Sequence, residues 1–261
     1  MAAETDYWRG KTVLIAGGSG GMGRAMAARF VADGANLYLC DINRRALDEA
    51  AADFDAGSTK VIETDVTRVA DCARAVNAAV DESGRLDLLI NAAGIWTEGA
   101  SEAATEAEWD RVVDVNLKGT FFMCRYAIPH LEKTGGNIIN ISSDAGIIGS
   151  KGAAIYCASK GGVNLLTKSL ARELAGRGIR VNAICPCDVD TPMIEYQATT
   201  FGGGDPEAYK RALLAIYPQG ARARFATPAE IAAFAYFVAS PEAAPITGAC
   251  LSIDFGTTAG L

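Results

Sequence analysis

The sequence predicts an α/β protein, a doubly wound parallel sheet with helices on both faces. Short, strongly apolar runs with the length of buried strands alternate along the chain with longer segments in which apolar residues recur at helical spacing. A glycine-rich turn joins the first of these runs to the first helical segment. Half of the 261 residues are apolar, which is enough for one sizeable core, and no repeat or composition shift indicates a second domain.

The first strand, residues 12–16, runs into the glycine turn, and helical spacing follows up to Gly34. The turn consists of Gly17, Gly18, Ser19, Gly20, Gly21, Met22 and Gly23. A turn with so few side chains lets a pyrophosphate approach the backbone, and the new helix presents unpaired N–H groups to it. Such a turn can also merely connect a strand to a helix, so the following strands decide its role.

An acidic residue ends the second strand. Residues 35–40 form this strand, and Asp41 and Ile42 follow it. A carboxylate at this distance from a glycine turn can accept hydrogen bonds from both hydroxyls of an adenosine ribose and repels a 2′-phosphate, which favours NAD over NADP. Arg44 and Arg45 could instead hold a phosphate, although we favour a solvated first turn of the next helix for both.

The third and fourth strands end in further candidate cofactor contacts. Residues 61–64 precede Asp65 and Val66, and an acid at such a strand end can contact an adenine or cap a helix. Residues 86–90 precede a group of small residues that would let a flat ring or a ribose approach the backbone. This group is Asn91, Ala92, Ala93 and Gly94.

A long helical pattern over residues 106–131 contains a polar residue, Asn116, amid apolar neighbours. A buried amide needs hydrogen-bond partners. Asn116 could therefore hold the fold together, or it could order a water beside the residues that carry the chemistry.

Those residues lie between positions 137 and 162. An apolar, β-branched strand ends at Ser142 and Ser143, and after a loop the helical spacing begins at about Ala153. Tyr156 and Lys160, four residues apart, then project from one helix face. An ammonium one turn away favours the phenolate and lowers the tyrosine pKa, and Ser143 could hold a substrate oxygen beside the phenol. The arrangement indicates proton transfer to and from an alcohol, although Tyr-x-x-x-Lys alone is more often structural.

The last part of the chain completes the sheet. Residues 179–184 form a buried strand, residues 228–240 a helix and residues 249–253 a final strand. Between them, residues 188–226 are rich in glycine, proline and aromatic residues and break the alternation. A long irregular segment of this kind is typical of a lid over a binding site.

Composition and charge exclude several classes of function. The net charge of −7 and the scattered basic residues argue against nucleic acid and anionic membranes as partners, and no apolar run is long enough to span a membrane. We expect a small-molecule substrate and a cytoplasmic location. The seven cysteines lack paired spacing, so we expect no metal, and the single histidine, His130, disfavours a Ser-His-Asp hydrolase.

Over essentially the whole chain these features resemble the short-chain dehydrogenase/reductase family. The matching residues are Gly17-x-x-x-Gly21-x-Gly23, Asp65, Asn91-Ala92-Ala93-Gly94, Asn116, Ser143 and Tyr156-x-x-x-Lys160. The resemblance implies a Rossmann fold with a seven-stranded parallel sheet and a homotetramer. It also implies that Tyr156 is the acid/base, that Lys160 lowers its pKa and holds the nicotinamide ribose, that Ser143 orients the substrate oxygen and that Asn116 supports a water-linked proton path.

The strand ends and the resemblance together give the candidate binding residues. For the cofactor, NAD, they are Gly17, Ser19, Gly20, Gly21, Met22, Gly23, Asp41, Ile42, Asp65, Val66, Asn91, Ala92, Ala93, Gly94, Tyr156, Lys160, Pro186, Val189 and Thr191. For the substrate they are Ser143, Asp144, Ala145, Tyr156, Cys187, Asp188, Met193 and Tyr196. This mainly apolar set with two acids suits a hydrophobic, cyclic or aromatic alcohol that bears a polar group.

Three residues depart from the family pattern. Ala16 stands where a threonine is usual, Cys187 replaces the glycine after Pro186, and Phe255 replaces a glycine near the end of the chain. We expect Cys187 to crowd the nicotinamide face or line the substrate pocket, and Phe255 to pack at a subunit contact or near the active site. The predicted function is NAD-dependent interconversion of a secondary alcohol and a ketone. The alternatives are an NADP-dependent ketone reductase and a non-catalytic, dinucleotide-binding regulatory protein.

Overall fold

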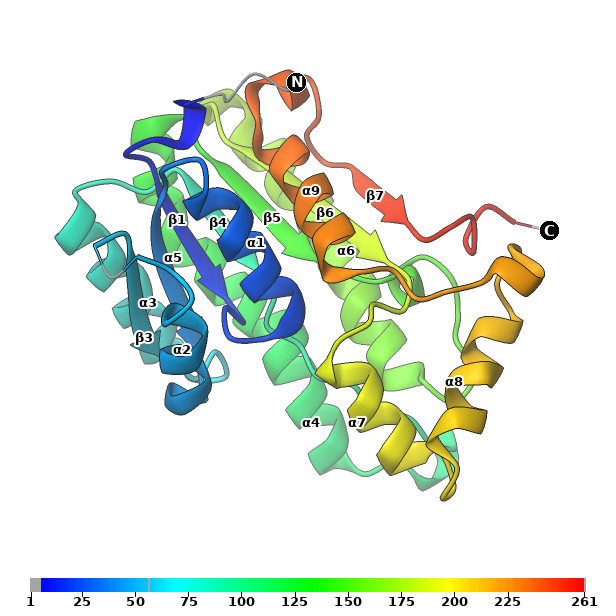
Figure 1. The fold of residues 1–261 in the computed structure, drawn as a ribbon. Helices are drawn as coiled ribbons and strands as arrows, with labels where there is room; N and C mark the ends of the chain where they lie inside the picture. Colours follow the sequence, from blue (N-terminus) through cyan, green and yellow to red (C-terminus); the bar gives the residue numbers. More distant parts are fainter. Residues whose placement is uncertain (1–5, 56, 261) are drawn as a thin grey trace.

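The computed structural model describes residues 6–55 and 57–260, and its centre is a parallel sheet of seven strands in the order β3-β2-β1-β4-β5-β6-β7 (Figure 1). The strands are β1 (Thr12–Ala16), β2 (Asn36–Asp41), β3 (Thr59–Glu63), β4 (Leu88–Asn91), β5 (Asn137–Ile141), β6 (Arg180–Pro186) and β7 (Cys250–Ile253). All of them pair in parallel. The predicted fold class, a seven-stranded, doubly wound α/β sheet, is confirmed.

Nine α-helices connect and flank the strands in the described part of the chain. They are α1 (Gly21–Val31), α2 (Arg44–Ala51), α3 (Val69–Ser83), α4 (Glu106–Val113), α5 (Thr120–Thr134), α6 (Ala154–Leu174), α7 (Pro192–Phe201), α8 (Pro206–Ala215) and α9 (Pro228–Ala239). None of the helices in residues 6–55 and 57–260 is long and apolar enough to cross a membrane.

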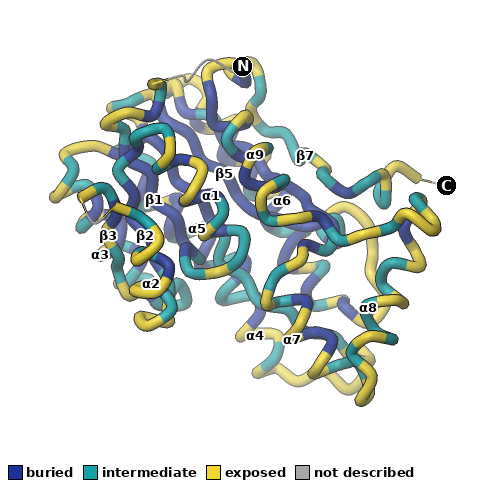
Figure 2. Tube along the Cα trace, in the orientation of Figure 1, coloured by how far each residue is buried: buried dark blue, intermediate teal, exposed yellow. Residues whose placement is uncertain are grey.

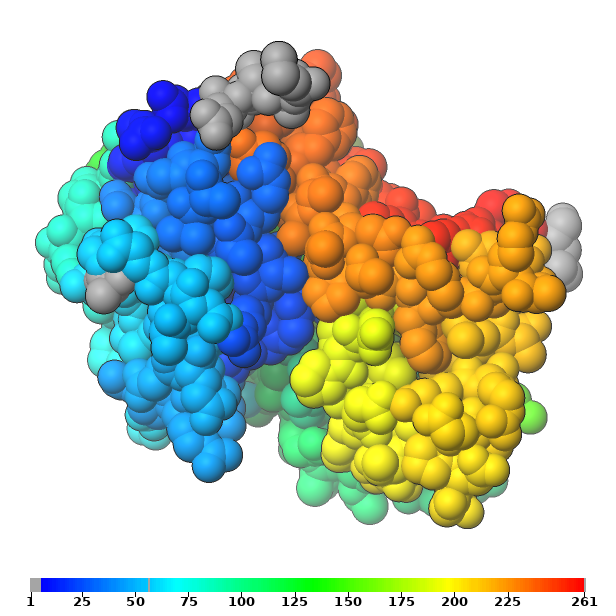
Figure 3. All heavy atoms as spheres, viewed as in Figure 1, coloured from blue at the N-terminus to red at the C-terminus, as the bar shows by residue number. Residues whose placement is uncertain are grey.

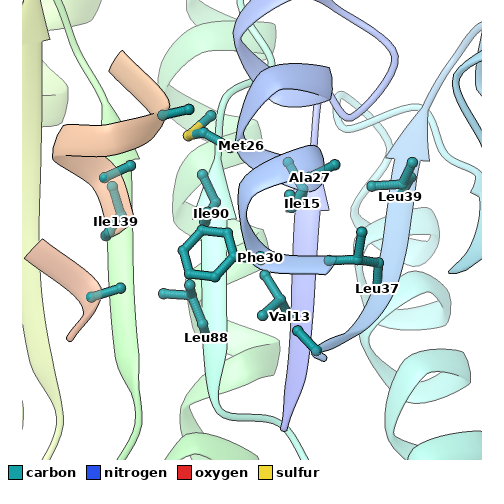
Figure 4. Close-up of a cluster of buried hydrophobic side chains, with 14 of the residues drawn as sticks. Val13, Ile15, Met26, Ala27, Phe30, Leu37, Leu39, Leu88, Ile90 and Ile139 are labelled. Atoms are coloured by element: carbon teal, nitrogen blue, oxygen red, sulfur yellow. The ribbon is translucent and has the colours of Figure 1, made fainter. Parts of the chain in front are cut away.

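The sheet separates two apolar cores because alternate side chains of each strand point to opposite faces. Val13 and Ile15 of β1 face a core that α1, α2 and α9 cover, whereas Leu14 and Ala16 face a core that α3, α5 and α6 cover. In the first core the Phe30 ring of α1 lies over Leu88, one of the β4 side chains (Figure 4). The inner strands of the sheet are therefore the most buried part of the molecule, whereas the edge strands β3 and β7 are largely half-buried or exposed (Figure 2).

The helical pattern predicted for residues 106–131 is one continuous helical segment, but its middle is wider than an α-helix. Residues Asp114–Gly119 form a π-helical stretch between α4 and α5, and Asn116 lies within it. Such stretches often occur at functional sites because they re-aim a side chain without ending the helix. The segment continues beyond the predicted end, to Thr134.

The sequence pattern predicted an irregular segment over residues 188–226. The structure instead has helices α7 and α8 there. The prediction was wrong because Pro192 and Pro206 each occupy the first position of a helix, where the missing N–H costs nothing. The Asp205 side chain also caps α8 by accepting a hydrogen bond from the Ala208 N–H at 2.8 Å. These two helices project beyond the carboxyl ends of the strands, and the surface is hollowed between them and the N-terminal part of the chain (Figures 1 and 3).

Candidate active site

The parallel arrangement brings the carboxyl ends of all seven strands to one edge of the sheet. Two adjoining cavities lie there. One, of about 550 Å³, is lined by the glycine turn, the ends of β2 and β4 and the start of α7. The other, of about 350 Å³, lies between the end of β5 and the helices α7 and α8. Met22, Thr191 and Met193 line both cavities, so a molecule in one would meet a molecule in the other.

The larger cavity fits a dinucleotide because part of its wall is bare backbone. Gly17 has a φ of +79°, and a Cβ placed on it would lie 2.5 Å from the backbone nitrogen of Ala93. No side chain could therefore replace this hydrogen without moving the two turns apart. Helix α1 begins at Gly21, and no described side chain caps its N-terminus at Gly20, which leaves the first N–H groups available to an anion.

Asp41 lines this cavity at the end of β2, and neighbouring groups fix its orientation. Its carboxylate accepts hydrogen bonds from the Ser19 hydroxyl at 2.6 Å and from the Asn43 N–H at 3.2 Å. Arg44 pairs with Asp48 at 3.0 Å and Arg45 with Glu49 at 3.6 Å, both along exposed positions of α2. The two arginines are thus engaged along their own helix, and the carboxylate of Asp41 remains at the cavity wall.

Most of the predicted cofactor residues line the larger cavity. They are Gly17, Gly20, Gly21, Met22, Gly23, Asp41, Ile42, Asp65, Val66, Ala92, Ala93, Gly94 and Thr191. Pro186 and Val189 line the smaller cavity instead. Asn91 lines neither cavity, because its buried amide donates to Asn140 Oδ1 at 2.9 Å and to Cys124 Sγ at 3.2 Å. Its amide group therefore ties strand β4 to β5 and α5.

Asn116 joins the π-helical stretch to the segment after β4 and to α6. Its side chain accepts from the Ile95 N–H at 2.9 Å and donates to the Ile95 carbonyl and to Ser159 Oγ, both at 3.0 Å. The three hydrogen bonds of the Asn116 side chain all go to protein atoms. This favours a structural role for Asn116 in holding the fold together. The amide oxygen and the Lys160 ammonium both border Gly94, since a Cβ on Gly94 would lie 3.5 Å from the first and 3.4 Å from the second.

Tyr156 and Ser143 meet in the smaller cavity, where the Tyr156 ring also packs against Trp96 with the two ring centroids 4.4 Å apart. Burial raises the pKa of the Tyr156 hydroxyl, a hydrogen bond with Ser143 lowers it in part, and the charges of Asp144 and Asp188 raise it further. Lys160 is not among the main causes of this shift, so the lowering of the tyrosine pKa by Lys160 stays a prediction. Burial dominates, and the phenol is held in its protonated form at neutral pH.

Lys160 lies between the Tyr156 ring and the end of β5. Its Nζ is 5.7 Å from the centroid of the Tyr156 ring and donates to the Ile141 carbonyl at 2.8 Å. Burial lowers the pKa of Lys160 to about 8. The ammonium is thus fixed at the end of β5, against Gly94 of the larger cavity. There the hydroxyl oxygens of a ribose could accept hydrogen bonds from its other N–H groups.

Seven of the eight predicted substrate residues line the smaller cavity: Ser143, Asp144, Ala145, Tyr156, Cys187, Asp188 and Met193. Tyr196 does not line it. This residue is half exposed on α7 and packs edge-on against Phe201, with the ring centroids 6.1 Å apart. Burial raises the pKa of Cys187 to about 11, so this residue is a neutral thiol in the cavity wall.

Several lining residues escaped the sequence analysis, chiefly Glu98, Lys151, Gln197, Tyr209, Leu213 and Ile216. Tyr209, Leu213 and Ile216 recur at helical spacing, and this signal becomes readable once α8 is known to be a helix. Glu98 has no comparable signal. The third departure from the family pattern, Phe255, packs in the apolar cluster that contains Cys187, with its ring 4.8 Å from the Arg224 guanidinium carbon. Among residues 6–55 and 57–260, no cluster of potential metal ligands occurs.

Comparisons with known proteins agree with this architecture. A family model described as enoyl-(acyl carrier protein) reductase matches residues 16–258. The chain is 36% identical to the meso-2,3-butanediol dehydrogenase of Serratia marcescens, over 95% of both chains. It is 38% identical to the trans-4-hydroxycyclohexanecarboxylate dehydrogenase of Sinomonas cyclohexanicum, over 100% of this chain and 97% of the relative. The 3-ketoacyl-(acyl-carrier-protein) reductase of Brucella melitensis, solved with NADH, superposes with a TM-score of 0.84 at 32% identity, over 96% and 99% of the two chains.

Proposed function

The chain belongs to the short-chain dehydrogenase/reductase family, and from this premise we propose that it interconverts a secondary alcohol and a ketone with NAD as cofactor. The family binds a nicotinamide dinucleotide, either NAD or NADP. The observation that carries the proposal is that Ser143 and Tyr156 share a cavity with Met22 of the glycine turn, which also lines the cofactor cavity, so that a hydroxyl held by the pair would adjoin a bound cofactor.

The proposed roles follow from the positions of the side chains. Ser143 and Tyr156 would hold the same substrate oxygen, with the tyrosine hydroxyl giving its proton to a carbonyl or, as phenolate, taking the proton of an alcohol. Lys160 and Asp41 would hold the two riboses, and the N-terminus of α1 the pyrophosphate. When bound, the nicotinamide would supply the hydride chemistry. Asn116 would keep Lys160 and the Ile95 segment in place.

The choice of NAD rests on Asp41. Its carboxylate lies at the cavity wall, and a 2′-phosphate there would meet its negative charge. Relatives support the alcohol class, because they include dehydrogenases named for butanediol and for a hydroxycyclohexane carboxylate. The alternatives, an NADP-dependent reductase and a regulatory protein without turnover, are outcomes of the same test. The cytoplasmic location stays a prediction.

The test is to measure reduced cofactor formation across a panel of cyclic, aromatic and acyclic secondary alcohols with NAD and with NADP. We expect turnover with NAD, at least about tenfold lower kcat/KM with NADP, and a rate of oxidation that rises as the pH increases, because burial keeps the Tyr156 phenol protonated at neutral pH.

The variant Tyr156→Phe should lose at least about a hundredfold in turnover, as expected for a general acid/base, while it binds NADH as the parent does. Binding is read from NADH fluorescence. A preference for NADP would identify the first alternative, and NADH binding without oxidation of any alcohol, or reduction of any ketone, would identify the second.

A further inference from the structure

The smaller cavity carries an excess of negative charge. Three carboxylates line it, those of Glu98, Asp144 and Asp188, and Lys151, which is exposed, is the cationic residue among the described residues that line it. None of the three acids forms an ion pair with a described lysine, arginine or histidine. Acids next to one another in a partly buried cavity are costly unless a ligand compensates their charge.

In each of these carboxylates, one of the two oxygens accepts hydrogen bonds from neighbouring side chains. Asp188 Oδ2 accepts from the Tyr217 hydroxyl at 2.9 Å, and Glu98 Oε2 accepts from Trp96 Nε1 at 2.8 Å and from the Tyr209 hydroxyl at 2.7 Å. Asp144 Oδ1 accepts from Ser143 Oγ at 2.8 Å. Within the described residues, no hydrogen bond reaches the second oxygen of any of the three. The acids are therefore fixed in orientation and retain acceptor capacity.

The rest of the wall also suits a cation. The rings of Trp96 and Tyr156 pack against each other in this cavity, and aromatic faces attract an ammonium group. Ser143, which precedes Asp144 in the chain, donates a hydrogen bond to its carboxylate, and the charge of Asp144 also acts on the Tyr156 hydroxyl. A secondary hydroxyl bound there would place a neighbouring substituent within reach of the carboxylates.

We propose that the substrate is an amino alcohol, whose ammonium group binds at Asp144 and Asp188 while its secondary hydroxyl is held by Ser143 and Tyr156; this rests on the proposed function. A neutral polyol would fill the free acceptor positions, but it would leave the repulsion between the acids unrelieved. Burial and the charge of Asp144 raise the pKa of Asp188 to about 6, which shows that the negative charges of the two acids disfavour each other in this cavity. A bound cation favours the ionised form of both acids.

A matched set of alcohols tests the proposal. The probes are 2-amino-1-phenylethanol, 1-phenylethane-1,2-diol and mandelate, which present the same secondary alcohol beside an ammonium, a hydroxyl and a carboxylate. We expect kcat/KM for the amino alcohol to exceed that of the diol by about tenfold or more, and mandelate to be poorest. Equal or better turnover of the diol would overturn the proposal and point to a polyol. Faster turnover of mandelate would overturn it as well.

Variants locate the effect. Asp188→Asn should lower the ratio of amino alcohol to diol by about tenfold, because one of the two charges is removed while the shape is kept. Glu102→Gln removes an exposed acid outside the cavity and should leave the ratio unchanged. A ratio that is the same in the parent and in Asp188→Asn would contradict the assignment.

If no alcohol of either panel is oxidised, the proposed function fails, and the amino alcohol fails as a substrate with it. Titration calorimetry of the unreactive pair 2-phenylethylamine and 2-phenylethanol then examines the charge of the cavity alone. Tighter binding of the amine, abolished in Asp188→Asn, would support the cation site, and equal binding of the two would overturn it.

Discussion

Asp188, which we propose as a ligand-binding residue, also carries a cost to stability. Its pKa is raised from 3.8 to about 6, mainly by burial, so the folded protein holds this proton more tightly than the unfolded chain does. Stability contributed by this residue is therefore present at low pH and is lost as the pH rises from about 4 to about 6. The fold disfavours the ionised form of Asp188. We infer that the residue is retained because a bound ligand compensates its negative charge.

Replacing Asp188 by Asn should show this cost. We expect the stability of Asp188→Asn relative to the parent to increase between about pH 4 and about pH 7, by at most about 3 kcal/mol, because the amide carries no charge. Urea unfolding at the two pH values measures the difference. Glu102→Gln, at an exposed position, is the control. A difference that does not depend on pH would contradict the interpretation.

At the scale of single residues, the sequence could predict those side chains whose placement depends on local structure. Ser143 follows a strand, and Tyr156 and Lys160 share a helix face, so the structure brings them to one edge of the sheet as expected. Glu98 could not be predicted. It meets Tyr209 across 111 residues of sequence, and only the packing of α8 against the segment after β4 brings the two together.

Among the elements, the turn between β1 and α1 depends most strictly on its residue type. Replacing Gly17 by Ala should abolish cofactor binding and lower the melting temperature, because the new Cβ would lie 2.5 Å from a backbone nitrogen that cannot move alone. Differential scanning fluorimetry with and without NADH measures both effects.

Gly10 provides a matched control for this variant. It also has a positive φ, of +72°, but a Cβ on it would meet nothing within 4 Å. Gly10→Ala therefore reports the backbone strain alone, about 1 kcal/mol or more, and should keep the shift in melting temperature that NADH causes. Equal behaviour of the two variants would mean that the close approach of the two turns is unimportant.

Helices were predictable where an apolar stripe marks the face against the sheet, as in α1 and α6. Helices α7 and α8 lie outside the sheet, although they too carry apolar residues at helical spacing, such as Tyr209 and Leu213 on α8. Pro192 and Pro206 mask this spacing because proline usually indicates a break in a helix, although both lie at helix starts. The π-helical turn at Asn116 left no mark in the periodicity at all.

For the whole molecule, the predicted homotetramer has a surface consistent with it. Trp109 on α4, Phe121 on α5 and Leu165 on α6 are 48%, 41% and 69% exposed. Helices α4 and α6 pack together, and α5 continues from α4 through the π-helical stretch. Large apolar side chains exposed on neighbouring helices are typical of an interaction surface.

Light scattering after size exclusion measures the assembly directly. We expect a mass of four chains, each of 27.2 kDa, and a shift to smaller species for Leu165→Lys, because an ammonium replaces an apolar contact. Lys60→Ala, on β3 at the sheet edge, is a surface control that should leave the mass unchanged. A monomeric parent would contradict the prediction.

The separation of the two cavities also has an evolutionary consequence. The larger cavity is built largely on the glycine turn and strand ends, where a change in one residue disturbs a buried sheet, and the oxygen-binding pair, Ser143 and Tyr156, comes from the segment after β5 and the first turn of α6. One side of the smaller cavity comes from α7 and α8, which contribute Met193, Ile194, Gln197, Tyr209 and Leu213 and have no strand between them. Changes at Ile194, Gln197, Tyr209 or Leu213 would alter the wall around a substrate and leave the sheet, Ser143 and Tyr156 in place, so new substrates could be accepted by a protein that already folds.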